Sequence, residues 1–179
     1  MRDNIDLVIF GSQGDLAKRK LLPALYRLDK ADLLPDNARI ASVARHQIST
    51  NIYLSQVQEN LQQVIPKKEW DNKVWTRFKR RIYYIKVDFS QKKQFNHVSD
   101  WMEENRKVIF YLATPPSLYE SICKHMASTG CVSENTRIVL EKPIGHDLRS
   151  SKQVNDVVGQ YFPEKNISVS YTHLRAHET

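Results

Sequence analysis

Short apolar runs alternate with longer amphipathic segments along most of this 179-residue chain. Near-continuous apolar runs are typical of strands whose two faces are both covered by helices. We predict such strands over residues 7–10, 39–43, 82–87, 108–112 and 138–140. Strands that alternate with helices form a parallel sheet through right-handed crossovers. The pattern therefore predicts the α/β class, with a doubly wound parallel sheet.

The segments between these runs carry apolar residues at helical spacing. Leucines recur between residues 21 and 28, and Pro23 suits the first turn of that helix. A second helical region spans residues 49–79 and is predicted to break at Pro66. Further helices are predicted to begin at the capping residues Ser90, Ser117 and Asp147.

Composition narrows the class of protein. The chain is 41% hydrophobic and has only five Gly and seven Pro, which excludes disordered and collagen-like material. Its longest apolar run, residues 108–113, is far shorter than the roughly 20 residues of a membrane span. Cys123 and Cys131 form neither a metal cluster nor a disulfide framework. We therefore expect a soluble cytoplasmic protein with no membrane partner.

The net charge of +7 favours anionic partners, either phosphorylated small molecules or nucleic acid. The basic clusters, around residues 18–20, 67–68 and 77–81, are scattered and form no long tail. An ordinary solvated basic surface explains the charge as well, so charge alone selects no ligand.

A glycine-containing turn follows the first predicted strand directly. It reads Gly11-Ser12-Gln13-Gly14-Asp15-Leu16. Small residues between a strand and a helix let backbone N–H groups approach a pyrophosphate, whose charge the helix start favours. The G-x-x-G spacing departs from the common G-x-G-x-x-G, and an ordinary glycine turn is the alternative. A phosphate loop at this position predicts a Rossmann-like dinucleotide-binding domain.

The end of the second predicted strand discriminates between cofactors. NAD-binding sheets usually place an acidic residue there to bind the ribose 2′-hydroxyl. This strand ends in Val43-Ala44-Arg45-His46, without a carboxylate. A guanidinium group suits a 2′-phosphate instead. Arg45 therefore indicates NADP, with a plain surface arginine as the alternative.

The ends of the other strands face the same crevice in such a sheet. Asp88 and Phe89 follow the third strand, where Asp88 is either a ligand residue or only a helix-entry residue. The turn Thr114-Pro115-Pro116 follows the fourth strand, and it either forms one side of the cofactor site or only redirects the chain. Lys142 follows the fifth and reaches a sugar hydroxyl or phosphate, unless it only pairs with Glu141 at the surface.

Together these segments resemble the glucose-6-phosphate dehydrogenase family in its bacterial form. The resemblance rests on residues 10–17, Ala44-Arg45, residues 111–116 and residues 139–145, in the family's order and spacing. The combination of the Gly-Asp-Leu loop, the Ala-Thr-Pro-Pro turn and the Glu-Lys-Pro segment is specific, and the likeness extends from about Asp6 to Ile167.

The resemblance implies an NADP-dependent oxidoreductase of glucose metabolism, in the pentose phosphate pathway. It implies oxidation of glucose 6-phosphate at C1 to 6-phosphogluconolactone. By the same resemblance, residues 11–16 hold the pyrophosphate and Arg45 the 2′-phosphate. Asp88 and Phe89 lie near the adenosine half, and Lys142 contacts both substrate and cofactor. Full-length members are expected to be homo-oligomers.

The end of the chain departs from the family, whose members continue into an R-I-D-H-Y-L-G-K-E segment and a larger C-terminal α+β domain. Thr172 stands where that segment has Asp. We interpret residues 1–167 as the NADP-binding domain and residues 168–179 as a foreign tail in place of the sixth strand. The family's catalytic base is then missing, so we expect no turnover from this chain alone. His173 and His177 lack a third ligand nearby, so no metal site is predicted.

Two alternatives remain. Other Rossmann NADP-linked sugar oxidoreductases also carry Glu-Lys-Pro after the fifth strand, although the phosphate loop and the Ala-Thr-Pro-Pro turn argue against them. A non-catalytic dinucleotide-binding module or a nucleic-acid binder is compatible with the charge of +7. Nucleic-acid affinity would fall steeply with salt, which a titration would detect.

Overall fold

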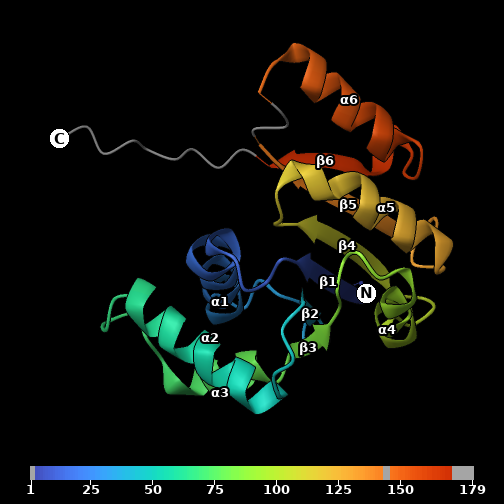
Figure 1. Ribbon diagram of the computed structural model, residues 1–179. Coiled ribbons are helices and arrows are strands. Elements are labelled where there is room, and N and C mark those ends of the chain that lie inside the picture. The colour runs from blue at the N-terminus through green and yellow to red at the C-terminus, as the bar shows by residue number, and fades with distance from the viewer. Residues whose placement is uncertain (1–2, 143–145, 171–179) are drawn as a thin grey trace.

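A computed structural model describes residues 3–142 and 146–170 of the chain. This part forms a six-stranded sheet in the order β3-β2-β1-β4-β5-β6 (Figure 1). The strands are β1 (Ile5–Phe10), β2 (Arg39–Ala44), β3 (Ile82–Lys86), β4 (Lys107–Leu112), β5 (Thr136–Glu141) and β6 (Ile167–Ser170). All neighbouring strands are parallel. The predicted doubly wound parallel sheet is confirmed.

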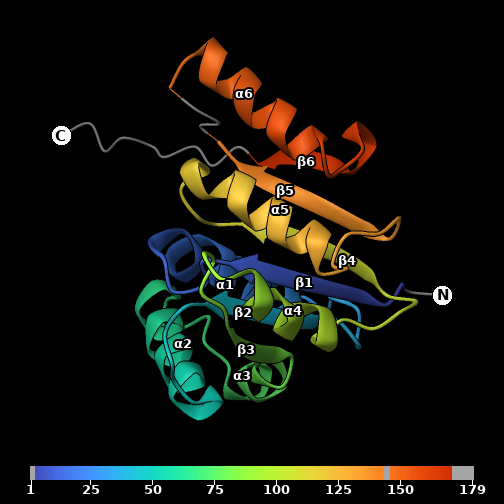
Figure 2. The same cartoon turned by 45° about the vertical axis from the view of Figure 1, so that its right-hand side comes forward.

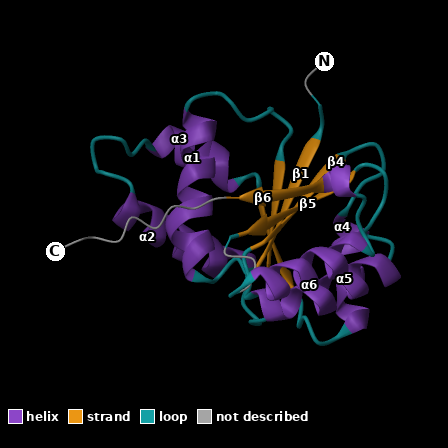
Figure 3. Ribbon diagram, turned by 90° about the horizontal axis from the view of Figure 1, so that it is seen from above, coloured by secondary structure: helices purple, strands orange, loops and turns teal. Residues whose placement is uncertain are grey.

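Helices cover both faces of the sheet. Figure 3 shows one layer made of α1 (Leu22–Lys30), α2 (Thr50–Val64) and α3 (Asn72–Lys79). The opposite layer consists of α4 (Asn96–Trp101), α5 (Tyr119–Ser128) and α6 (Leu148–Gly159), of which α4 and α5 lie in front of the strands in Figure 2. The short helical turns are η1 (Ala17–Leu21), η2 (Lys92–Phe95), η3 (Pro116–Leu118) and η4 (Glu164–Asn166).

Each layer encloses its own core, because successive strand residues point to opposite faces. Val8 and Phe10 of β1 pack with α4, α5 and α6, whereas Ile9 between them packs with α1, α2 and α3. Strands buried on both faces need apolar side chains at nearly every position. This requirement explains the near-continuous apolar runs in the sequence.

Some of the predicted helix starts are confirmed and others are wrong. Asp147 caps α6 in a reciprocal capping box with Ser150, and Pro23 lies in the first turn of α1. The chain also breaks between α2 and α3, where Pro66 lies. Ser90 is not a cap, since η2 begins at Lys92 after Gln91. Ser117 lies inside η3, and α5 begins after it without a side-chain cap.

The expectation that the chain lacks a sixth strand is wrong. Residues 167–170 form β6, which pairs with β5 from Ile138↔Ile167 to Glu141↔Ser170. The sheet therefore continues three residues past the boundary predicted at residue 167. Residues 171–179, including His173 and His177, lie outside the described residues.

Two further observations concern the class of the protein. Within residues 3–142 and 146–170, no helix is both long enough and apolar enough to cross a bilayer. Cys123 and Cys131 are free and buried, and burial raises the pKa of the Cys123 thiol to about 12. Both thiols belong to the core that packs against α4, α5 and α6.

Candidate dinucleotide-binding site

The predicted phosphate loop lies at the point where the strand order reverses. Strand β1 has β2 on one side and β4 on the other, and ligands of open α/β sheets bind at the carboxyl ends of strands at such a switch point. Gly11 follows β1 with a φ of +87°. A Cβ at this residue would lie only 2.7 Å from the Ala113 carbonyl oxygen after β4. The loop thus requires glycine for both its conformation and its close approach to β4.

Backbone hydrogen bonds tie this loop to the end of β2. The N–H groups of Gly11 and Ser12 donate to the Val43 carbonyl oxygen at 3.0 and 3.2 Å, and Gly14 N–H donates to Gly11 O at 3.0 Å. A Cβ at Gly14 would lie 3.3 Å from that same Gly11 oxygen, so this position also favours glycine. Asp15 is exposed and Leu16 half-buried where the chain turns into η1 and α1.

Polar atoms without partners cluster around the loop. Gln13 Oε1 and Thr114 Oγ1 are buried and have no hydrogen-bond partner in the described part of the protein. Buried polar atoms are almost always satisfied, so such a group commonly marks a place where a ligand or water binds. The glycine cradle and these unpaired atoms fit a dinucleotide pyrophosphate.

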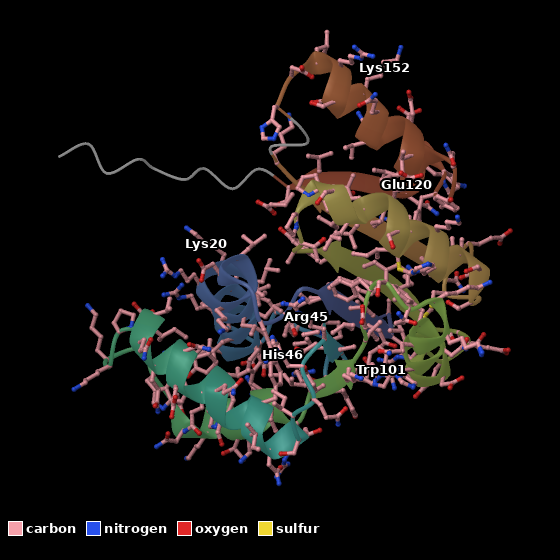
Figure 4. All side chains as sticks on the ribbon, in the orientation of Figure 1. Lys20, Arg45, His46, Trp101, Glu120 and Lys152 are labelled. Carbon is pink, nitrogen blue, oxygen red and sulfur yellow. The ribbon has the colours of Figure 1, made fainter. Side chains whose placement is uncertain are left out.

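The turn after β2 carries Arg45 and His46 side by side, both exposed, with Lys20 of η1 on the same side of the molecule (Figure 4). His46 lines a polar crevice of about 320 Å³ together with Gln13 of the phosphate loop and Lys18 of η1. Glu59 on α2 also lines this crevice and contributes a carboxylate to it. The crevice therefore contains both a lysine and a carboxylate, and Arg45 precedes its lining residue His46 in the chain.

Asp88, after β3, has a clear local role. Its carboxylate accepts hydrogen bonds from the backbone N–H and the hydroxyl of Ser90, at 3.0 and 2.7 Å. The Ser90 bonds hold the pKa of Asp88 below its usual value, with smaller contributions from Lys86 and Arg45. The helix-entry interpretation of Asp88 fits this geometry. The ends of β2 and β3 are joined by a backbone hydrogen bond from Val87 N–H to Ala44 O at 2.9 Å.

Phe89 is fixed by contacts on two sides. Its ring meets Phe10 edge-on at a centroid distance of 5.7 Å. Its carbonyl oxygen accepts from Ser121 Oγ at 3.2 Å and faces His125 Nδ1 at 3.1 Å, both on α5. The loop after β3 therefore has a fixed position at the carboxyl edge of the sheet.

The ends of β4 and β5 lie on the other side of the switch point. After β4, Ala113 lies against Gly11, and the chain then turns through η3 into α5. After β5, Lys142 is exposed, and its backbone N–H donates to Ser170 O at 3.0 Å. The neighbouring Glu141 accepts a hydrogen bond from the Tyr111 hydroxyl of β4. Pro143, Ile144 and Gly145 lie outside the described residues.

The structure thus brings the predicted segments to one edge of the sheet. Residues 11–16, 45, 88–89 and 142 all follow carboxyl ends of strands. Sequence reasoning missed Lys18 and His46 in the polar crevice, and Tyr111 beside Glu141. A chain pattern does not reveal which side chains meet between neighbouring strands, although the basic run at residues 18–20 was visible.

Comparison with known proteins decides the family. The family described as "Glucose-6-phosphate dehydrogenase, NAD binding domain" matches residues 8–169 of this chain. The chain belongs to the glucose-6-phosphate dehydrogenase family. Because the matched unit is the family's NAD-binding domain, the chain carries a domain for a nicotinamide dinucleotide.

Relatives within the glucose-6-phosphate dehydrogenase family cover this chain almost completely. The glucose-6-phosphate 1-dehydrogenase of Dickeya dadantii (strain 3937) is 38% identical over 160 residues, which are 89% of this chain and 32% of the relative. That of Mycolicibacterium smegmatis is 38% identical over 171 residues, 92% of this chain and 34% of the relative. The chain therefore spans about one third of the length of these relatives.

A solved glucose-6-phosphate dehydrogenase structure shows the same fold. The crystal structure of glucose-6-phosphate 1-dehydrogenase from Mycobacterium avium superposes with a TM-score of 0.87 at 28% identity. The superposition covers 95% of this chain and 36% of the other. The expected Rossmann-like domain of this family is confirmed.

Proposed function

We propose that this chain supplies the NADP-binding domain for oxidation of glucose 6-phosphate at C1 to 6-phosphogluconolactone. The observation that carries the choice of NADP is the end of β2, where Arg45 stands beside the phosphate loop and no carboxylate follows the strand. A guanidinium group pairs with a 2′-phosphate, whereas a carboxylate at that place would bind the 2′-hydroxyl of NAD.

Each predicted site residue has a role in this proposal. The loop of Gly11, Ser12, Gln13, Gly14, Asp15 and Leu16 holds the pyrophosphate. Arg45 binds the 2′-phosphate at the rim of the crevice that Gln13, Lys18 and His46 line. Asp88 and Phe89 flank the adenosine half. Lys142 contacts cofactor and substrate at the end of β5.

The nicotinamide ring of the bound cofactor would accept the hydride from C1 of the sugar. The residues of this chain bind and orient the two reactants, since a hydride transfer depends on holding donor and acceptor together. Lys142 is an exposed cation at the carboxyl edge of the sheet, and a compact three-donor ammonium suits a phosphate or a sugar hydroxyl. Glucose 6-phosphate as the substrate is inferred from the activity named in the relatives.

Isothermal titration of the chain with NADP and NAD tests the cofactor assignment. We expect tighter binding of NADP, and Arg45→Ala to weaken it by about ten- to a hundredfold, the usual cost of a hydrogen bond to a charged group. Affinity for NAD should change little, because NAD has no 2′-phosphate.

Arg137→Ala is the matched control. Arg137 is an exposed arginine on β5 and lines a hollow with Asp3 and Lys107, which precede or begin strands β1 and β4. The substitution removes the same positive charge, but at a place away from the carboxyl edge of the sheet. The affinities for NADP and for NAD should therefore both stay unchanged. Equal binding of NADP and NAD by the unsubstituted chain, or an Arg45→Ala variant with undiminished preference, would overturn the NADP assignment.

A further inference from the structure

A hydrogen bond links β3 to the turn that carries Arg45. The Tyr84 hydroxyl donates to the His46 carbonyl oxygen at 2.6 Å. Tyr84 lies on β3 opposite Ser42 of β2, so its side chain reaches along the sheet to the residues after β2. Arg45 and His46 are themselves exposed. This bond therefore fixes the backbone of a turn that has few buried side chains.

The ring of Tyr84 is in turn fixed by α2. It packs on Tyr53 at a centroid distance of 4.7 Å, with 37° between the ring planes. Tyr53 is only 2% exposed. Burial raises the pKa of both tyrosines, so both hydroxyls remain donors at neutral pH. The Tyr84 hydroxyl thus reaches His46 from a rigid aromatic pair.

The same pair extends beneath the phosphate loop. The Tyr53 hydroxyl lies close to the hydroxyls of Ser42 and Ser12. All three are buried, and none of them reaches hydrogen-bond geometry with another group of the protein. Tyr53 and Tyr84 therefore lie between Ser12 of the phosphate loop and His46 of the turn after β2.

We propose that Tyr84 is a positioning residue for 2′-phosphate recognition, holding the Arg45–His46 turn in place through the His46 carbonyl oxygen. The proposal rests on the proposed function of Arg45. An unrestrained turn must be ordered when the ligand binds, and this ordering weakens affinity. In this proposal the turn binds the 2′-phosphate, which NAD lacks. Loss of the Tyr84–His46 hydrogen bond should therefore weaken the binding of NADP and not that of NAD.

The test is a pair of tyrosine-to-phenylalanine substitutions on the same strand. Tyr84→Phe keeps the ring on Tyr53 and removes only the hydroxyl. We expect the Kd for NADP to rise about three- to tenfold, the range for one neutral hydrogen bond, while the Kd for NAD stays unchanged. Water can reach the exposed His46, so the thermal midpoint should stay near that of the unsubstituted chain.

Tyr83→Phe is the control. Tyr83 is the preceding residue on β3, points to the opposite face, is 41% exposed and packs against Trp101. It should change neither affinity. A Tyr84→Phe variant that weakens NADP and NAD equally, with a lowered thermal midpoint, would show a merely structural residue and overturn the proposal. Unchanged affinity for both would overturn it as well.

A double substitution separates this proposal from the one on which it rests. If Tyr84 acts through the turn, Tyr84→Phe should have no further effect on NADP in an Arg45→Ala background. If Tyr84→Phe weakens NADP binding in the Arg45→Ala background as much as it does in the unsubstituted chain, Tyr84 does not act through Arg45. If Arg45→Ala alone leaves the NADP preference intact, the proposed function fails. If Arg45→Ala abolishes the preference and Tyr84→Phe does not reduce it, only the positioning role fails.

Discussion

Gly11 has a φ of +87°, and a Cβ built there would lie 2.7 Å from the Ala113 carbonyl oxygen. Gly130 has a similar φ of +78°, but nothing lies within 4 Å of its Cβ position. Alanine at either residue meets left-handed strain of roughly 1–2 kcal/mol. At Gly11 it must also displace the backbone after β4.

We therefore expect Gly11→Ala to lower the free energy of unfolding more than Gly130→Ala does, and to weaken NADP binding. Gly130→Ala should leave binding intact, because Gly130 follows α5 and is not part of the site. Urea unfolding and calorimetric titration of both variants measure these effects. Equal loss of stability in the two variants, with unchanged binding, would contradict the close approach of the loop to β4.

Tyr111 gives a prediction for alkaline pH. Burial first, and then its hydrogen bond to Glu141, raise the pKa of Tyr111 to about 12, from the ordinary value of about 10. The folded chain therefore holds this proton more tightly than the unfolded chain. Its contribution to stability is complete below about pH 10 and is lost as the pH rises toward 12.

Between pH 10 and pH 12, the free energy of unfolding of the Tyr111→Phe variant should therefore fall less than that of the unsubstituted chain. The variant lacks the part of this decline that comes from ionisation of Tyr111. The decline should not vanish, since the pKa values of Tyr26, Tyr53, Tyr84 and Tyr119 are raised too. Urea unfolding at several alkaline pH values measures the difference. Identical pH slopes for the two proteins would argue against a shifted Tyr111.

At the scale of elements, one buried carboxylate ties strands together at the edge opposite the site. Asp6 of β1 is fully buried and accepts from Arg39 Nε of β2 at 2.9 Å and from Arg106 Nε, next to β4, at 2.7 Å. Removing the carboxylate leaves the buried Arg106 guanidinium without its ionic partner, which costs about 3–5 kcal/mol.

Asp6→Ala should therefore lower the free energy of unfolding by about that amount. The exposed pair of Asp3 with Lys107 is the comparison, and Asp3→Ala should have a far smaller effect, because exposed ion pairs contribute little to stability. Chemical denaturation measures both. A small effect of Asp6→Ala, similar to that of Asp3→Ala, would show that the buried ion pairs contribute little to holding the strands.

The structural elements differ in how far the sequence predicts them. The first five strands were predictable because each contains a short run of apolar or aromatic residues. Strand β6 was not, since Ile167–Ser170 is short, pairs only with β5 and has an alternating, partly polar pattern. Ser90 fails as a cap because Asp88, two residues earlier, accepts its N–H and hydroxyl. At residues 115–117, the prolines lead directly into the turn η3, which includes Ser117.

In the molecule as a whole, topology explains why segments distant in the sequence lie along one edge of the sheet. Parallel strands end at the same edge, so the residues following β1, β2, β3 and β5 line that edge without any sequence proximity. This much follows from the alternation of strands and helices. The contacts of Tyr84 with His46 and of Tyr111 with Glu141 do not, because they depend on which side chains face each other between strands.

We infer that the turn after β2 binds the 2′-phosphate of NADP. Phosphorus NMR observes this phosphate separately from the pyrophosphate during titration with the chain. Because Arg45 provides a guanidinium partner beside the phosphate loop, we expect the 2′-phosphate resonance to shift on binding and to lose that shift in Arg45→Ala. A pyrophosphate resonance that responds to binding while the 2′-phosphate resonance stays at its free position would contradict this role of the turn.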